Sequence, residues 1–158
     1  MKTLKLATAF AVLAAPVLAE GDAAAGEQAF NRQCVSCHVV ADAGGNVLAG
    51  RNAKTGPNLF GIIGRAPGSV DGFNYGDDIV AAQEFVAAWD EEQLAAYMQD
   101  PTAWLRSTTG SNSARSKMSF KVRQEADAAN IAAFLATFAE SSIPNGTDQR
   151  APSGRPFL

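Results

Sequence analysis

The stretch Cys34-Val35-Ser36-Cys37-His38 decides the fold of this chain of 158 residues. It has the CxxCH spacing of a covalent haem-attachment site, in which the two thiols add to the vinyl groups of the porphyrin and the histidine ligates the iron. The chain has two cysteines and one histidine in all, and this motif contains every one of them. The sequence therefore predicts one covalent haem c on Cys34 and Cys37, with His38 as an axial ligand.

Three other interpretations of the two cysteines compete with haem attachment. A structural zinc site needs four ligands, and only carboxylates are left to complete one. A thioredoxin-like CxxC motif requires a βαβ context, which the chain does not suggest. A disulfide between the two cysteines would suit an oxidising compartment, but it gives no purpose to the long glycine-rich stretch that follows. We therefore prefer the haem interpretation.

The second axial ligand must come from a small set, because the chain has no second histidine. The sixth coordination position of the iron could be taken by methionine, lysine, tyrosine or water, or it could be open. Met98 lies four residues after Leu94 on an apolar helical face, where methionine usually fills a core. Met118 lies in the non-periodic stretch 116–120, which has no core to fill. We expect Met118 to be the sixth ligand, although the sequence alone does not exclude Met98.

Both ends of the chain are expected to lie outside the folded domain. Residues 1–19 have the basic start, short apolar run and small-residue end of a secretory signal, so we expect cleavage after Ala19. Because Pro16 interrupts a run that is already too short to span a bilayer, we expect no stable membrane insertion. Residues 141–158, rich in proline and glycine, predict an extended tail. Residues 20–140 are left as a single domain.

Apolar periodicity predicts an all-α domain with long loops. The expected helices cover about residues 22–32, 90–99 and 125–138, with a further short helix from Pro101. Glycines crowd residues 39–67, which predicts loops and turns rather than strands. Residues 106–116 are small and polar and predict a surface loop. No segment alternates well enough to predict a strand.

The charges argue against nucleic acid as a partner. Without Lys2 and Lys5, 11 basic and 16 acidic residues remain, a formal charge of −5. Residues 66–100 hold eight acidic side chains and no Lys or Arg, whereas residues 101–124 hold five basic ones and no acid. Such clustering can be an accident of a solvated surface. Our hypothesis is that basic residues rim the exposed haem edge and steer it onto acidic partners. The expected docking residues are Arg32, Lys54, Lys117, Lys121 and Arg123.

An ordered set of motifs extends well beyond CxxCH, over about residues 21–138. The set comprises Gly26 with Phe30, Thr55-Gly56-Pro57-Asn58-Leu59-Phe60-Gly61, Gly64-Arg65, Phe73-Asn74-Tyr75, Trp89, Tyr97 with Pro101, Lys117-Met118, and the Ile131/Phe134/Leu135 helix. In this order it resembles the class I cytochromes c, in particular the large bacterial cytochrome c2 type. The resemblance implies the cytochrome c fold: a few helices and long loops wrapped around one covalent haem c.

The same resemblance implies roles for five further residues. The carbonyl of Pro57 would accept the Nδ1 hydrogen of His38 and leave Nε2 for the iron. Tyr97 matches the residue whose hydroxyl reaches the methionine sulfur. The positions that match hydrogen-bond donors to the haem propionates are Arg65, Tyr75 and Trp89.

A haem closed by a histidine and a methionine has no open position for a substrate, which predicts one-electron exchange rather than enzymatic catalysis. The resemblance implies a soluble, monomeric, periplasmic carrier of photosynthetic or respiratory electron transport. Its donor would be the quinol:cytochrome c oxidoreductase (the bc complex), and its acceptor a photosynthetic reaction centre or a terminal cytochrome oxidase. The alternatives are a haem enzyme or gas or redox sensor with a labile methionine, and a thiol oxidoreductase without haem.

Overall fold

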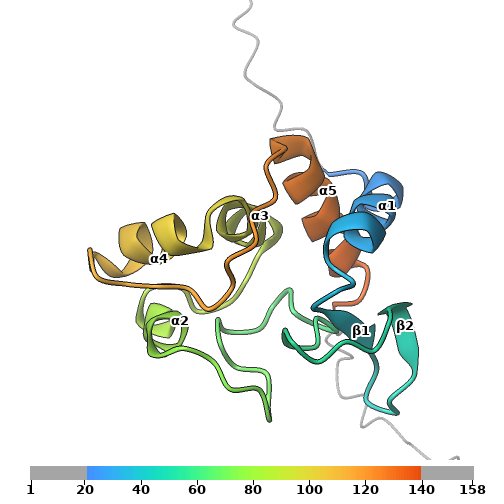
Figure 1. Cartoon of the computed structure of the whole chain (residues 1–158), viewed down its shortest axis with the longest axis horizontal. Coiled ribbons are helices and arrows are strands. Elements are labelled where there is room, and N and C mark those ends of the chain that lie inside the picture. The colour runs from blue at the N-terminus through green and yellow to red at the C-terminus, as the bar shows by residue number, and fades with distance from the viewer. Residues whose placement is uncertain (1–20, 140–158) are drawn as a thin grey trace, which may run out of the picture.

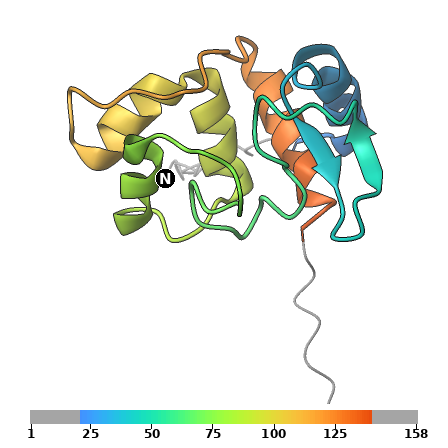
Figure 2. The same cartoon turned by 60° about the horizontal axis from the view of Figure 1, so that its bottom comes forward.

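The computed structural model describes residues 21–139, so the expected signal peptide and C-terminal tail lie outside the described residues. The elements in chain order are α1 (Ala23–Gln33), β1 (Val39–Ala41), β2 (Val47–Gly50), α2 (Asp77–Ala81), the 3₁₀ helix η1 (Ala82–Glu84), α3 (Glu91–Gln99), α4 (Pro101–Thr109) and α5 (Glu125–Ala136). Figures 1 and 2 show α1, α5 and the strands on one side of the molecule, and α2 and α4 on the other. Within this described part, no helix is long and apolar enough to cross a membrane.

Aspartates define the starts of three helices. The Asp22 carboxylate accepts hydrogen bonds from the backbone of Ala24 and Ala25, at 2.8 and 3.1 Å, and thereby caps α1. Asp90 caps α3 in the same way, through the backbone of Gln93 at 2.7 Å. Asp100 caps α4, whose first residue is a proline that needs no hydrogen-bond acceptor. The predicted helices at 22–32, 90–99 and 125–138 are confirmed to within two residues at each end.

The packing of α1 against α5 joins the two ends of the described chain. A Cβ atom added at Gly26 would lie 1.9 Å from the backbone oxygen of Asn130, so only glycine permits this helix crossing. The Phe30 and Phe134 rings pack beside it with their centroids 5.5 Å apart. Phe30 and Ile131 are fully buried, and they place the core directly behind the CxxCH motif.

The expectation of no strand is wrong at residues 39–50. Val39 pairs with Gly50, and the two short strands form an antiparallel hairpin with an irregularity after Val40. Val40 is buried, whereas Val47 and Leu48 are 45% and 48% exposed. Since the apolar residues of the second strand face solvent, the hairpin has no alternating pattern to reveal it.

The short helix expected from Pro101 is confirmed as α4, but its last turn, helix α2 and the 3₁₀ helix η1 were not predicted. Helix α4 continues through Thr109, inside the stretch expected to be a surface loop from residue 106, and ends at Gly110 with a φ of 70°. Its last turns are polar in sequence, but the hydroxyl of Thr109 donates back to the carbonyl of the buried Leu105 at 2.7 Å. Helix α2 has only five residues, too few for a helical period to show in the sequence.

Candidate functional site

A cavity of about 610 Å³ opens beside the CxxCH motif, between the two sides of the molecule. Its apolar wall comprises Leu59, Ile62, Ile79, Leu94, Val122, Ile131 and Leu135. The two cysteines, His38, Met98 and Met118 also line it, so the structure brings the predicted covalent and axial residues to one cavity. A mostly apolar cavity of this size suits a large apolar group.

The His38 ring is fixed from two directions. Its Nδ1 lies 3.0 Å from the carbonyl oxygen of Pro57, which accepts the Nδ1 hydrogen and leaves the Nε2 lone pair available for a metal. Burial lowers the pKa of His38, and the Pro57 carbonyl partly opposes this shift. The imidazole is therefore neutral at physiological pH, as metal ligation requires. This is the hydrogen bond that the resemblance implied for Pro57.

Gly56 lets the backbone approach the face of this ring. A Cβ atom at residue 56 would lie 2.4 to 2.8 Å from three atoms of the His38 imidazole. The Gly56 amide also donates to the carbonyl of Cys37 at 2.7 Å, so a backbone hydrogen bond joins the CxxCH turn to the Gly56-Pro57 segment. His38 itself donates its amide to the carbonyl of Cys34 at 2.9 Å.

Cys34 and Cys37 are not joined in a disulfide, and both lie half-buried at the edge of the cavity. Burial, with a smaller effect of the neighbouring Cys37, raises the pKa of the Cys34 thiol to about 12. An isolated thiol with such a pKa is inert as a nucleophile at neutral pH. The cavity, the two thiols, the neutral imidazole and the glycine beneath it together fit a covalently attached haem, with Cys34, Cys37 and His38 as its holders.

The three expected propionate contacts are adjacent, but only two line the cavity. Tyr75 and Trp89 are part of the lining, whereas Arg65 lies outside it and is half-buried. The amide of Trp89 donates to the carbonyl of Arg65 at 2.8 Å, and Trp89 accepts from Gly64 at the same distance, so the backbone places the indole beside the arginine. Burial raises the pKa of Tyr75, and the positive charge of Arg65 partly opposes this shift.

Met118 lies in a loop that we define as residues 115–121, the Met118 loop. Within the described residues, no backbone hydrogen bond joins this loop to another segment's backbone; the first such bond follows it, from the Val122 amide to the carbonyl of Met98 at 2.8 Å. Side chains hold the loop instead. The Ser116 hydroxyl accepts the amide hydrogen of Met118 at 3.1 Å and lies 2.9 Å from the hydroxyl of Tyr97. The Ser116 amide donates to the Thr102 hydroxyl at 3.3 Å.

Tyr97 therefore reaches the Met118 loop, but its hydroxyl bonds Ser116. Its ring packs in an aromatic cluster with Trp89 and Trp104, with centroids 4.9 to 5.5 Å apart. Burial raises the pKa of Tyr97, so its hydroxyl keeps its proton and can donate. Met98 is 5% exposed and belongs to the main hydrophobic core on α3, while also lining the cavity.

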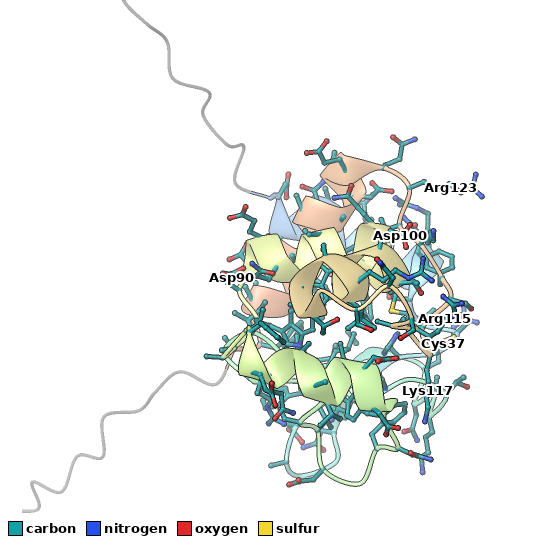
Figure 3. All side chains as sticks on the ribbon, turned by 90° about the vertical axis from the view of Figure 1, so that its left-hand side faces the viewer. Cys37, Asp90, Asp100, Arg115, Lys117 and Arg123 are labelled. Atoms are coloured by element: carbon teal, nitrogen blue, oxygen red, sulfur yellow. The ribbon has the colours of Figure 1, made fainter. Side chains whose placement is uncertain are left out.

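The expected docking residues do not form one equivalent set. Lys117 extends its ammonium group to the backbone oxygens of Asn74 and Tyr75, at 3.0 and 2.8 Å. Lys121 forms an ion pair with Asp100 at 2.6 Å. Arg32, Lys54 and Arg123 are exposed, and Arg32 lies at the mouth of the cavity. Figure 3 shows Arg115, Lys117 and Arg123 along the edge that contains Cys37, with Asp90 at the opposite edge.

The sequence reasoning missed the residues that hold the Met118 loop. The acceptors of the loop's backbone amides are Asp78 on α2, Thr102 on α4 and Ser116 of the loop itself. Short polar side chains at a helix start or in a loop have ordinary solvated roles, so no residue pattern distinguished these three. Asp78 lies 37 residues away in sequence from Arg115, whose amide bonds it, and Thr102 lies 14 residues away from Ser116, whose amide bonds it.

Comparisons with known proteins give a single answer. The family model described as Cytochrome c matches residues 23–139. A curated cytochrome c2 from Cereibacter sphaeroides is 50% identical over 137 residues, which cover 85% of this chain and 92% of that protein. A curated cytochrome c-551 from Roseobacter denitrificans is 46% identical over 142 residues, covering 89% of this chain and 98% of that protein.

Solved structures agree with the sequence comparisons. The crystal structure of cytochrome c2 from Rhodobacter sphaeroides superposes with a TM-score of 0.72 at 50% identity, covering 76% of this chain and 98% of that chain. Ferric cytochrome c-550 from Paracoccus versutus superposes with a TM-score of 0.70 at 43% identity, covering 76% of this chain and 99% of that chain. Both matches cover nearly all of the neighbour and about three quarters of this chain.

Proposed function

Since the chain belongs to the cytochrome c family, binds one haem c covalently and is an electron carrier rather than an enzyme, we propose that it is a periplasmic single-electron shuttle. We further propose His38 and Met118 as the axial ligands of the haem iron. The observation that carries the proposal is that Cys34, Cys37, His38 and Met118 all line one apolar cavity. The bound haem supplies reversible one-electron iron chemistry, and a thioether ligand raises its reduction potential.

The residues of the chain do the rest. Cys34 and Cys37 hold the group through thioether bonds, and the Pro57 carbonyl keeps His38 in one tautomer and one orientation. The apolar wall, with Ile79 and Leu94 among its residues, excludes water from the site. A site whose ligands stay in place in both oxidation states needs little reorganisation, which suits rapid electron exchange.

Met118 is preferred over Met98 because of what each side chain already does. Met98 packs in the hydrophobic core of α3, and its carbonyl accepts the amide of Val122. Met118 lies half-buried in a loop at the cavity, and Ser116 orients its backbone. If Met98 ligated the iron, its side chain would leave the hydrophobic core and create a cavity there, whereas Met118 can supply its sulfur from the loop without disturbing the core.

The cytochrome c2 relatives and the sequence support a proposal for the partners and the compartment. We propose that residues 1–19 direct secretion, that the bc complex is the donor, and that a reaction centre or cytochrome oxidase is the acceptor. Arg32, which lines the cavity, and Arg123, on the edge of the molecule that contains Cys37, would meet acidic partner surfaces. Lys121 contributes less to this contact, because Asp100 already neutralises it.

A second candidate function, a sensor with a labile methionine, is favoured by one observation. The Met118 loop has no backbone-to-backbone hydrogen bonds to the rest of the described chain. A loop held by side chains opens at lower cost than one held by a backbone ladder, and an open sixth position would bind small ligands.

Optical spectra of the holoprotein separate the two candidates. We would compare wild type with Met118→Ala and Met98→Ala in both oxidation states. The carrier predicts an Fe(III)–thioether charge-transfer band that Met118→Ala alone abolishes, together with carbon monoxide binding to that variant only. A wild type that lacks the band and binds carbon monoxide quickly would favour the sensor. Loss of the band in Met98→Ala alone would contradict the choice of Met118.

Charge reversal tests the docking surface. Arg123→Glu should lower the second-order rate with an acidic partner several-fold at low salt, and the difference should disappear as salt screens it. Lys121→Glu should have a smaller effect, because Asp100 already pairs with that ammonium. Arg51→Glu, an exposed position outside the docking set, serves as the control. Equal rates for Arg123→Glu and Arg51→Glu would contradict the docking surface.

A further inference from the structure

The Met118 loop is attached to the lower side of the molecule by a carboxylate on α2. The amide of Arg115 donates to Oδ2 of Asp78 at 2.9 Å, across 37 residues of sequence. This is the shortest of the hydrogen bonds donated by the loop's backbone amides, and its acceptor carries a full negative charge. Figure 1 shows the chain after α4 running back between α4 and α2.

The other contacts of the loop backbone come from one side only. Thr102 lies on α4, and Tyr97, which bonds Ser116, lies on α3. Asp78 approaches from the opposite side of the loop, on α2. The Lys117 side chain adds contacts to Asn74 and Tyr75, just before α2. Among the described residues, however, Asp78 is the only acceptor on the α2 side for a backbone amide of the loop, so its removal leaves the Ser116 amide, bonded to Thr102, as the only amide of the loop that bonds another element.

Helix α2 is a firm support despite its length. Ile79, the residue next to Asp78, is 7% exposed and lines the cavity, so the helix is anchored in the apolar wall. Gln83, in the adjoining η1, donates its side-chain amide to the Pro67 carbonyl at 2.7 Å. The Asp78 carboxylate is therefore presented from an anchored element. A carboxylate accepting a backbone N–H is among the stronger hydrogen bonds in proteins.

We propose that Asp78 is a positioning residue that holds the Met118 loop closed and thereby sets how readily Met118 leaves the iron. This inference rests on the proposed function, because it takes Met118 as the sixth ligand. Asp78 does not line the cavity and acts only through the Arg115 amide. Its effect is on the opening of the loop and not on the iron directly.

The neighbouring residue provides a matched control. Asp77 and Asp78 both lie in the first turn of α2, where each carries the same charge toward the positive end of the helix. Asp77 is exposed and makes no side-chain hydrogen bond to the described residues. Asp77→Ala and Asp78→Ala therefore remove the same charge from the same helix turn, and only the second removes the contact with the loop.

The test is the binding of exogenous imidazole to the ferric holoprotein at fixed pH, since imidazole enters only after methionine leaves. Asp78→Ala should bind imidazole about five times faster or more than Asp77→Ala, the scale expected for a partly exposed, charge-assisted hydrogen bond. Asp78→Asn keeps an acceptor oxygen and should lie near wild type. Hydrogen exchange at the Arg115 amide should rise in Asp78→Ala only.

Each outcome has one meaning. A wild type without the thioether band would overturn the proposed function, whatever the variants do. A wild type with that band, but with imidazole binding equal in Asp78→Ala and Asp77→Ala, would overturn the role of Asp78 alone. Circular dichroism and the thermal midpoint establish that both alanine variants are folded. If Asp78→Ala unfolds, the comparison of Asp78→Asn with Asp78→Ser decides, since the serine is too short to reach the amide.

Discussion

The two walls of the cavity, the histidine wall (residues 34–38 with Gly56 and Pro57) and the methionine wall (the Met118 loop), are built in different ways. On the histidine side, backbone groups make the contacts: the amides of His38 and Gly56 donate to Cys34 and Cys37, and the Pro57 carbonyl accepts from the ring. On the methionine side, the Met118 loop is held by side chains, namely Asp78 of α2, Thr102 of α4 and its own Ser116. The difference teaches that one axial position is fixed by the course of the main chain and the other by replaceable side chains.

If the histidine wall is set by the backbone, the most damaging change there is an added atom rather than a lost one. Gly56→Ala would place a Cβ atom 2.4 Å from the nearest atom of the His38 ring. We expect a loss of about 3 kcal/mol or more in the free energy of unfolding of the holoprotein, with a displaced histidine in its spectra. Chemical denaturation with optical detection provides both measurements.

Gly76→Ala is the control for that substitution. Its Cβ atom would meet only the flexible side chain of Lys117, at 3.5 Å or more, and its φ of −82° suits any residue. We expect a change below about 1 kcal/mol. Equal stabilities of Gly56→Ala and Gly76→Ala would mean that the backbone around His38 accommodates the added Cβ atom, which would contradict the prediction.

On the methionine wall the sensitive change is the loss of a side-chain atom. Ser116→Ala leaves the amide of Met118 and the hydroxyl of Tyr97 without their partner. We expect a loss of about 1 to 2 kcal/mol and faster hydrogen exchange at the Met118 amide. Ser119→Ala, an exposed serine of the same loop, should change neither quantity. Unaltered exchange in Ser116→Ala would show that the loop does not depend on its side chains.

The smallest effect is expected where the loop ends, at the exposed pair of Lys121 and Asp100. The side-chain hydrogen bond to Lys121, together with the α4 amides, holds the pKa of the Asp100 carboxyl below its ordinary value of 3.8. A lowered carboxyl pKa stabilises the fold above the unfolded value, and this contribution is lost as the pH falls through the folded value. Lys121→Gln should therefore lower stability slightly at pH 7 and less below pH 3.8. Denaturation curves of wild type and Lys121→Gln at pH 7 and below pH 3.8 test this prediction. A difference in the free energy of unfolding that grows as the pH falls would contradict it.

The same contrast explains what the sequence could predict. The CxxCH motif itself predicted the role of His38. The contact between His38 and Pro57 was expected only because the ordered motifs resemble the class I cytochromes c. Helix starts at Asp22 and Asp90 could also be predicted, because a cap is a local signal. The CxxCH motif and the helix caps need no knowledge of distant residues.

The methionine wall was predictable only in part. Met118 was selected because no core demanded it, but the partners of its loop come from α2, α3 and α4. Their meeting depends on the tertiary fold, and a lone Asp78 or Thr102 looks like any surface residue. The β1–β2 hairpin escaped for a related reason, since Val47 and Leu48 face solvent and break the alternation that marks a strand.

The crossing of α1 and α5 has a consequence for the order of events during synthesis. The backbone of Asp22 bonds the Asn130 side chain across 108 residues, and Gly26 fits only against the same helix. A chain made from its N-terminus therefore carries α1 without its partner until nearly all of the domain has emerged. The contact that joins the two ends of the domain is therefore a long-range step, which forms only when nearly all of the domain is present.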